Sequence, residues 1–167
     1  MTMATTSTDQ LITWLNSAYS MEQALEHVLQ NHARDAEDFP DIQARDEQHL
    51  EETRRHAERV KYCLSLLGEK PSGAKSLIGN LTGMVQAPST GMYKDELVKN
   101  FLSDYAAEHF EIACYRSLIA AAHACGRPEI AEVCREILQD EEEMARWLEE
   151  RIPQVTTTYL QLHAARA

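Results

Sequence analysis

Apolar residues recur every three or four positions in four stretches of the chain. This spacing lines one face of an α-helix, so the pattern predicts four long amphipathic helices. No stretch alternates apolar and polar residues in the way a half-buried strand would. The expected helices cover residues 9–34, 41–67, 94–124 and a last stretch from about residue 128 to 151.

Glycine and proline mark the expected helix ends. Gly68 follows the second helix and Gly126 the third, where glycine commonly ends a helix. Pro128 stands at the first position of the last helix, which proline tolerates. We expect that helix to end near Arg151, because Pro153 lacks the backbone N–H that a helix interior needs.

The lengths of the connections predict the fold class. Two connections are short, and the middle one, residues 68–94, is long enough to cross the bundle and to hold a short extra helix near 74–86. The chain is therefore expected to be all-α, a four-helix bundle with one long crossover. We expect residues 1–8 to be a disordered tail and 9–152 to form the bundle, with 153–167 as a C-terminal extension.

Glutamate interrupts the apolar stripes where leucine would otherwise pack. Glu22, Glu108 and Glu141 each lie within a stripe, and Glu52 lies beside one. A carboxylate on a buried face is costly unless it is protonated, paired or bound to a cation. Several such carboxylates at one level therefore indicate a metal site.

The helical hairpins place these glutamates at one level. Glu22 and Glu52 are equally far from the turn expected at 35–40, and Glu108 and Glu141 are equally far from the turn near Gly126. Because every helical residue rises by about 1.5 Å, residues equidistant from a hairpin turn stand at the same height. The spacing thus predicts that the four carboxylates meet inside the bundle.

Further residues of ligand type lie one helical turn from this set. Glu111 follows Glu108 by three residues, and His49 precedes Glu52 by three. Carboxylates suit hard cations, and imidazole suits iron and manganese as well as zinc. His56 is interpreted as an edge residue or as a supporting partner of a ligand. The candidate metal ligands are Glu22, His49, Glu52, Glu108, Glu111 and Glu141.

Composition excludes several classes of function. The net charge of −11 argues against binding nucleic acid or anionic membranes. No apolar run reaches the length of a membrane span, and the first residues lack a secretory signal. The four cysteines form no C-x-x-C pair, and three of them lie in apolar helical surroundings. These features predict a cytoplasmic protein with small core cysteines.

Four segments, one in each expected helix, carry a family resemblance. The chain resembles the ferritin-like superfamily, and more closely the YciE/YciF family of stress-associated bacterial proteins. The resemblance implies a ferritin-like bundle, a tendency to form homodimers and a dinuclear site of the iron type. The third helix also looks like that of rubrerythrins, peroxide-reducing di-iron proteins with an extra glutamate there. The segments are YSMEQAL (19–25), HLEETRRHAERV (49–60), AAEHFEIACYRSL (106–118) and ILQDEEE (137–143).

The chain departs from the usual ferritin-like pattern of Glu-x-x-His on the second and fourth helices. Arg55 and Met144 stand where those histidines would be, and the expected fourth helix has none. Cysteine pairs of the rubredoxin type are also missing, so a peroxidase reaction would require an outside reductant.

Three functions remain open at this stage. The preferred hypothesis is a dimetal-carboxylate protein that handles peroxide or dioxygen during stress, with Glu52 and Glu108 bridging and Glu22 and Glu141 as terminal ligands. No catalytic residue is assigned. The alternative is a non-enzymatic structural or interaction protein with an empty site, which Arg55 near the carboxylates would favour. Iron storage would require a cage of many subunits.

Overall fold

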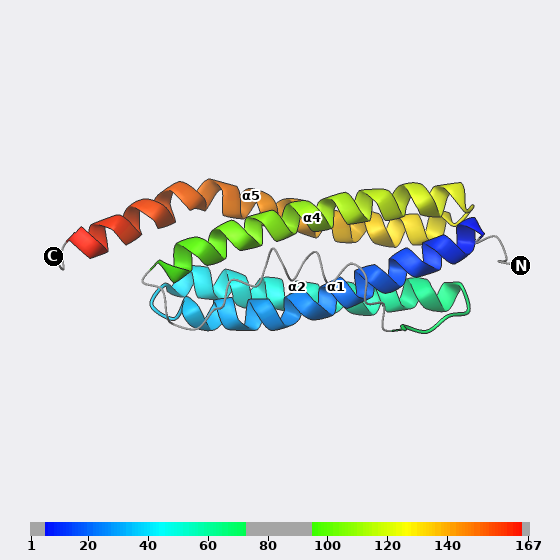
Figure 1. Ribbon diagram of the computed structural model, residues 1–167, viewed down its shortest axis with the longest axis horizontal. Coiled ribbons are helices and arrows are strands. Elements are labelled where there is room, and N and C mark those ends of the chain that lie inside the picture. The colour runs from blue at the N-terminus through cyan, green and yellow to red at the C-terminus, as the bar shows by residue number, and fades with distance from the viewer. Residues whose placement is uncertain (1–5, 73–94, 165–167) are drawn as a thin grey trace, which may run out of the picture.

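Four long helices form the computed structural model, which describes residues 6–72 and 95–164 (Figure 1). The short helix expected near 74–86 lies outside the described residues. The described chain is all-α, and its helix ends agree with the expected ones to within two residues except at the last. The helices are α1 (Ser7–Asp35), α2 (Pro40–Leu66), α4 (Glu96–Ala124) and α5 (Pro128–Ala164).

Two antiparallel hairpins make up the bundle. α1 packs along α2 and α4 along α5, and the hairpins meet through α1 against α4 and α2 against α5. The chain enters α1 through a capping box, in which Thr6 and Asp9 bond each other's backbone N–H groups. α1 therefore begins two residues inside the tail expected at 1–8.

Apolar side chains fill the bundle in two separate clusters. The large cluster occupies the end where α2 and α4 finish, and it includes Leu15, Val60 and Ile137. The small cluster occupies the opposite end and includes Phe101 and Leu148. Buried polar residues lie between the clusters on all four helices. The site expected from the sequence falls in this middle layer.

α5 does not end where it was expected to. It passes through Pro153, bends, and runs beyond the other helices toward the C-terminus (Figure 1). Proline inside a helix costs about 3 kcal/mol through a missing hydrogen bond and a clash. Packing opposes this cost here, because Val155 is buried in the small cluster and Ile152 packs against it. The expectation based on proline alone was wrong.

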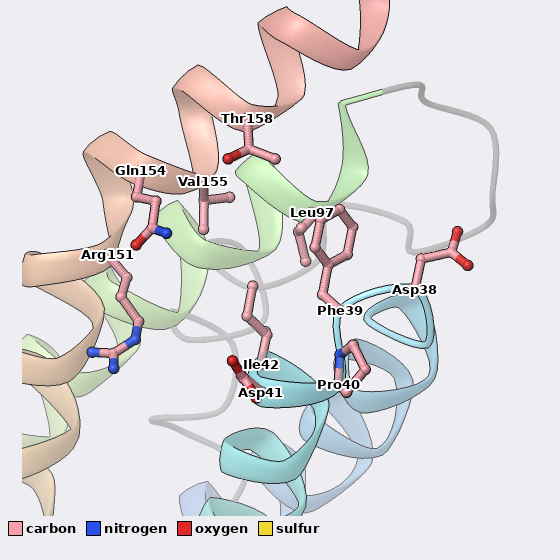
Figure 2. Close-up of a pocket in the computed structure, with 10 residues that line it drawn as sticks. All are labelled: Asp38, Phe39, Pro40, Asp41, Ile42, Leu97, Arg151, Gln154, Val155 and Thr158. Carbon is pink, nitrogen blue, oxygen red and sulfur yellow. The ribbon is translucent and has the colours of Figure 1, made fainter.

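The extension of α5 helps to form a pocket at this end of the bundle. The pocket has a volume of about 370 Å³ and lies between the α1–α2 turn, the start of α4 and α5 (Figure 2). Phe39, Leu97 and Val155 supply apolar walls, and Arg151 stacks over Trp147 at 4.3 Å. None of the candidate ligands lines this pocket.

Among the described helices, none is both long enough and apolar enough to cross a membrane.

The turn between α4 and α5 generates a stability prediction. Gly126 has a φ of +68°, in the left-handed region that other residues adopt at a cost, and an added Cβ there would meet no atom within 4 Å. Gly126→Ala should therefore lower the free energy of unfolding by about 1 kcal/mol through backbone strain alone. Urea denaturation measures this, with Gly126→Asn as the control, because asparagine tolerates this conformation better. An unchanged midpoint for the alanine variant would contradict the assignment.

Candidate metal centre

The structure buries all six candidate ligands in the layer between the two apolar clusters. Five of them are at most 2% exposed, and only Glu52, at 7%, stands closer to the surface. Each helix contributes, because the glutamate within each stripe faces the bundle axis as the helical spacing requires. The prediction that the glutamates lie inward is thus confirmed, while their role as ligands stays a prediction.

Two groups of three residues present ligand atoms that converge. The first is Glu22, His56 and Glu141, and the second is His49, Glu108 and Glu141. Within each group the ligand atoms lie within 4.8 Å of one another. Glu141 belongs to both groups, so its carboxylate joins the two converging sets of ligand atoms.

The first group centres on the His56 imidazole. Its Nδ1 lies 2.9 Å from Glu141 Oε1 and 3.8 Å from Glu22 Oε2. Its other nitrogen, Nε2, lies 3.0 Å from Asp140 Oδ2. The Tyr115 hydroxyl donates a hydrogen bond to Glu22 Oε1, which leaves Glu22 Oε2 facing the group.

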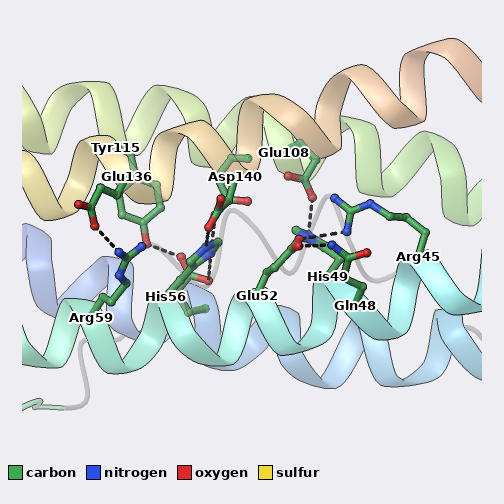
Figure 3. Close-up of polar contacts among 12 residues, drawn as sticks. Arg45, Gln48, His49, Glu52, His56, Arg59, Glu108, Tyr115, Glu136 and Asp140 are labelled. Atoms are coloured by element: carbon green, nitrogen blue, oxygen red, sulfur yellow. Dashed lines mark hydrogen bonds and ion pairs between the residues drawn. The ribbon is translucent and has the colours of Figure 1, made fainter.

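The second group repeats this arrangement around His49. Its Nε2 lies 2.9 Å from Glu108 Oε1, and its Nδ1 lies 3.3 Å from Glu52 Oε2. Each histidine thus contacts a flanking carboxylate through one nitrogen and turns the other into the cluster (Figure 3). Metal-ligating histidines in proteins are oriented by such a carboxylate partner.

Several buried atoms of the cluster lack a hydrogen-bond partner among the described residues. His56 Nδ1 and Glu141 Oε1 approach to 2.9 Å without the orientation of a hydrogen bond. Such orphaned polar atoms are uncommon in folded proteins, because each costs about 1–3 kcal/mol. Lone pairs that converge without bonding one another fit ligation of a shared cation. The orphaned atoms are Glu22 Oε2, His56 Nδ1, Glu108 Oε2 and both carboxylate oxygens of Glu141.

Glu52 is turned away from the cluster toward other partners. Arg45 Nη1 lies 3.0 Å from its Oε2, and Gln48 Nε2 donates to its Oε1 at 2.8 Å. Burial alone would raise the pKa of Glu52, but His49, Arg45 and Gln48 outweigh burial and lower it to about 2. This geometry favours Glu52 as the partner that orients His49, and Glu141, rather than Glu52, as the shared carboxylate.

The arginine that reaches the centre is Arg45. Arg55, which the sequence placed near the site, is exposed. Among the described residues, Arg45 forms its ion pair with Glu52 and none with the four inner glutamates.

Burial and mutual repulsion raise the pKa values of the inner glutamates. Burial, followed by the charge of Glu141, raises the pKa of Glu22 to about 8. Burial likewise raises the pKa of Glu108 to about 7, although His49 opposes this. Burial, followed by the charge of Glu141, raises the pKa of Glu111 well above its usual value. Glu111 faces the cluster but belongs to neither converging group.

Sequence reasoning missed His56 as an inward residue. The structure buries it completely, so its interpretation as an edge residue was wrong. The signal was the spacing of His49, Thr53, His56 and Val60, which alternates steps of four and three residues as one helix face does. Asp140, on α5, is partly exposed, and its carboxylate still reaches His56. The buried residues of α2 are Ile42, Asp46, His49, Leu50, Glu52, Thr53, His56, Val60, Cys63 and Leu64.

A second buried polar group lies one level closer to the α1–α2 turn. His32 Nδ1 lies 2.8 Å and 3.0 Å from the two carboxylate oxygens of Asp104. Asp46 is buried beside them, and burial followed by the charge of Asp104 raises its pKa to about 7. This group does not form a converging ligand set, and it extends the polar layer from the centre toward one end of the bundle.

The family of the chain follows from its sequence. Residues 6–161 match a family described as a domain of unknown function, DUF892. The chain belongs to this family.

Solved structures resemble this DUF892 protein over most of its length. A protein from Xanthomonas campestris pv. campestris is 35% identical with a TM-score of 0.81, and the match covers 95% of this chain and 99% of that one. YcfI from Rhodopseudomonas palustris is 28% identical with a TM-score of 0.78, over 86% and 93% of the two chains. The stress protein YciF from E. coli is 23% identical with a TM-score of 0.76, over 92% and 99%. The last likeness concerns the fold, and it confirms the expected ferritin-like bundle of the YciF type.

The raised pKa values predict how the stability of the metal-free DUF892 protein depends on pH. Glu22 and Glu108 have pKa values of about 8 and 7 when folded, against 4.5 as the usual value. The folded state therefore binds more protons than the unfolded state, and the free energy of unfolding falls as the pH rises through this range. His56 acts in the same direction, because its contacts with Asp140 and Glu141 outweigh burial and raise its pKa to about 10.

We expect a fall of more than about 1 kcal/mol between pH 5 and pH 8 in the metal-free protein. Urea denaturation at four pH values measures it. Glu22→Gln/Glu108→Gln, which cannot ionise, should flatten the profile. A rise in stability with pH would mean that the inner carboxylates are not held in a repulsive cluster.

Proposed function

We propose that this protein is a dimetal-carboxylate protein that reduces peroxide or dioxygen. The observation that carries the proposal is the pair of converging ligand groups joined by Glu141, whose oxygens have no hydrogen-bond partner among the described residues. Three carboxylates and two imidazoles form these groups, a donor set that suits iron or manganese. Two divalent cations would also relieve the repulsion that raises the pKa values of Glu22 and Glu108.

The residues around the groups would position the ligands and carry protons. Asp140 orients His56, and Glu52 orients His49, so that each presents a fixed nitrogen. Bound iron or manganese would polarise the oxidant and supply electrons. Tyr115 donates its hydroxyl proton to Glu22, and Glu111 faces the same layer. Reduction of peroxide to water consumes protons, and these two groups are the candidates to carry them.

The two apolar clusters would keep bulk water away from the centre. They close the bundle above and below the polar layer. Exclusion of water strengthens the electrostatic contacts within the layer and limits side reactions of the oxidant.

The setting of this reaction is part of the proposal. The E. coli protein of the same fold is called a stress protein, and we infer that this chain also acts during oxidative stress. We further propose a cytoplasmic homodimer. Equilibrium sedimentation tests the dimer, and a cage of many subunits would instead support iron storage.

Metal content tests the centre directly. Wild-type protein loaded anaerobically with iron or manganese should hold about two ions per chain, and Glu141→Gln should lose most of both because it removes the shared ligand. Glu143→Ala, an exposed neighbour, is the matched control and should keep both ions. Circular dichroism establishes that the glutamine variant folds. Full metal content in folded Glu141→Gln would contradict the shared role.

A non-enzymatic structural protein is the second candidate, and one observation favours it. Protonated His49 and His56 would form ion pairs with Glu108 and Glu141 at 2.9 Å without any metal. Contacts with the neighbouring carboxylates outweigh burial and raise the pKa of both histidines, so both would carry charge at neutral pH.

Peroxide consumption separates the two candidates. With ascorbate as reductant, metal-loaded wild-type protein should remove peroxide at least about tenfold faster than metal-free protein. His49→Gln and His56→Gln should each reduce both the rate and the metal content, because each removes one nitrogen ligand. Equal rates with and without metal, at wild-type stability, would favour the structural role.

A further inference from the structure

Two cysteines face each other inside the large apolar cluster. Cys63 on α2 and Cys134 on α5 are both completely buried. Both belong to the same apolar cluster, and each sulfur shifts the pKa of the other. Neither residue belongs to the two converging ligand groups.

The register of the two helices places this pair in line with the centre. α2 and α5 run antiparallel, and His56 contacts Glu141 across them at 2.9 Å. Arg59 pairs with Glu136 farther along the same interface. Cys63 lies seven residues after His56 on α2, and Cys134 lies seven residues before Glu141 on α5. Seven residues are about 10 Å of helix, so the thiols lie two turns from the His56–Glu141 contact.

The two sulfurs differ in character. The neighbouring Cys134 thiol, with a smaller contribution from Arg59, outweighs burial and lowers the pKa of Cys63. Cys63, followed by burial, raises the pKa of Cys134. A pair with one sulfur readier to ionise is suited to forming a disulfide, in which the thiolate is the reactive form.

The other two cysteines have no such arrangement. Cys114 and Cys125 are partly exposed, and burial raises the pKa of Cys114 to about 11. They provide internal controls for thiol chemistry.

We propose that Cys63 and Cys134 are a redox-active dithiol that supplies two electrons for peroxide reduction at the centre and becomes a disulfide. The inference rests on the proposed function. It gives the bundle an internal electron donor in place of the missing rubredoxin-type cysteines.

The reaction balances with peroxide as the oxidant. The two thiols lose two electrons and two protons, and one S–S bond forms between them. The peroxide gains the same electrons and protons, its O–O bond breaks, and two molecules of water result. One disulfide therefore forms for each peroxide reduced in this way, and an added dithiol restores the thiols by exchange once unfolding exposes the buried disulfide.

The experiment counts thiols and maps the cross-link. Metal-loaded and metal-free proteins receive peroxide without any external reductant, and are then denatured in acid and analysed by intact mass and peptide mapping. The loaded wild type should lose about 2 Da and two of its four thiols, with the Cys63 and Cys134 peptides linked and released by dithiothreitol. The double variant Cys114→Ala/Cys125→Ala should also form the link. The double variant Cys63→Ala/Cys134→Ala should keep its two remaining thiols. The metal-free protein should form the link at least about tenfold more slowly.

Separate outcomes distinguish this inference from the proposed function. If loaded Cys63→Ala/Cys134→Ala still consumes peroxide with ascorbate while the loaded wild type keeps all four thiols, the inference is wrong and the proposed function stands. If the link forms equally fast without metal, the pair does not serve the centre and the inference is wrong. If neither peroxide loss nor thiol loss occurs in loaded protein, the proposed function fails and the inference falls with it.

Discussion

The structure depends on how four helices bury several carboxylates at one level. An unpaired buried carboxylate is among the least favourable groups in a protein core, and here Glu22, Glu108, Glu111 and Glu141 share one layer. Two apolar clusters on either side of this layer hold the helices together and oppose the repulsion between the carboxylates. The layer therefore has two ways to become stable. It can retain protons, as the raised pKa values show for the metal-free protein, or it can exchange those protons for cations.

The overall fold was predictable because it depends on repeated features of the sequence. Four apolar stripes, two tight turns and one long connection restrict an all-α chain to a few topologies. The inward position of the glutamates was predictable for the same reason, since each replaces an apolar residue within a stripe. Pro153 shows where this reasoning stops. The local cost of a proline is readable from sequence, but the packing of Val155 that opposes it depends on residues distant in the chain.

The details of the site depended on which residues of α2 face inward. From the sequence, Glu52 was expected among the ligands, and His56 was expected at an edge or as a supporting partner. In the structure His49 and His56, seven residues apart, both face inward. α2 alone supplies a nitrogen to each ligand group, and α5 supplies Glu141 to both. The departure from the Glu-x-x-His pattern thus moves the imidazoles to one helix and does not remove them.

The inward face of α2 also connects the polar layer to the two cysteines. Residues seven apart on this helix stay on one face, so the stripe that turns His56 toward Glu141 also turns Cys63 toward Cys134. A core that needed only small side chains could use alanine at both positions with less chemical risk, since a thiol near an oxidising centre is open to oxidation. Both thiols are shielded from solvent. If the centre reduces peroxide as proposed, burial restricts these thiols to oxidants that arise within the bundle, and the antiparallel register of α2 and α5 sets the distance over which the electrons would travel.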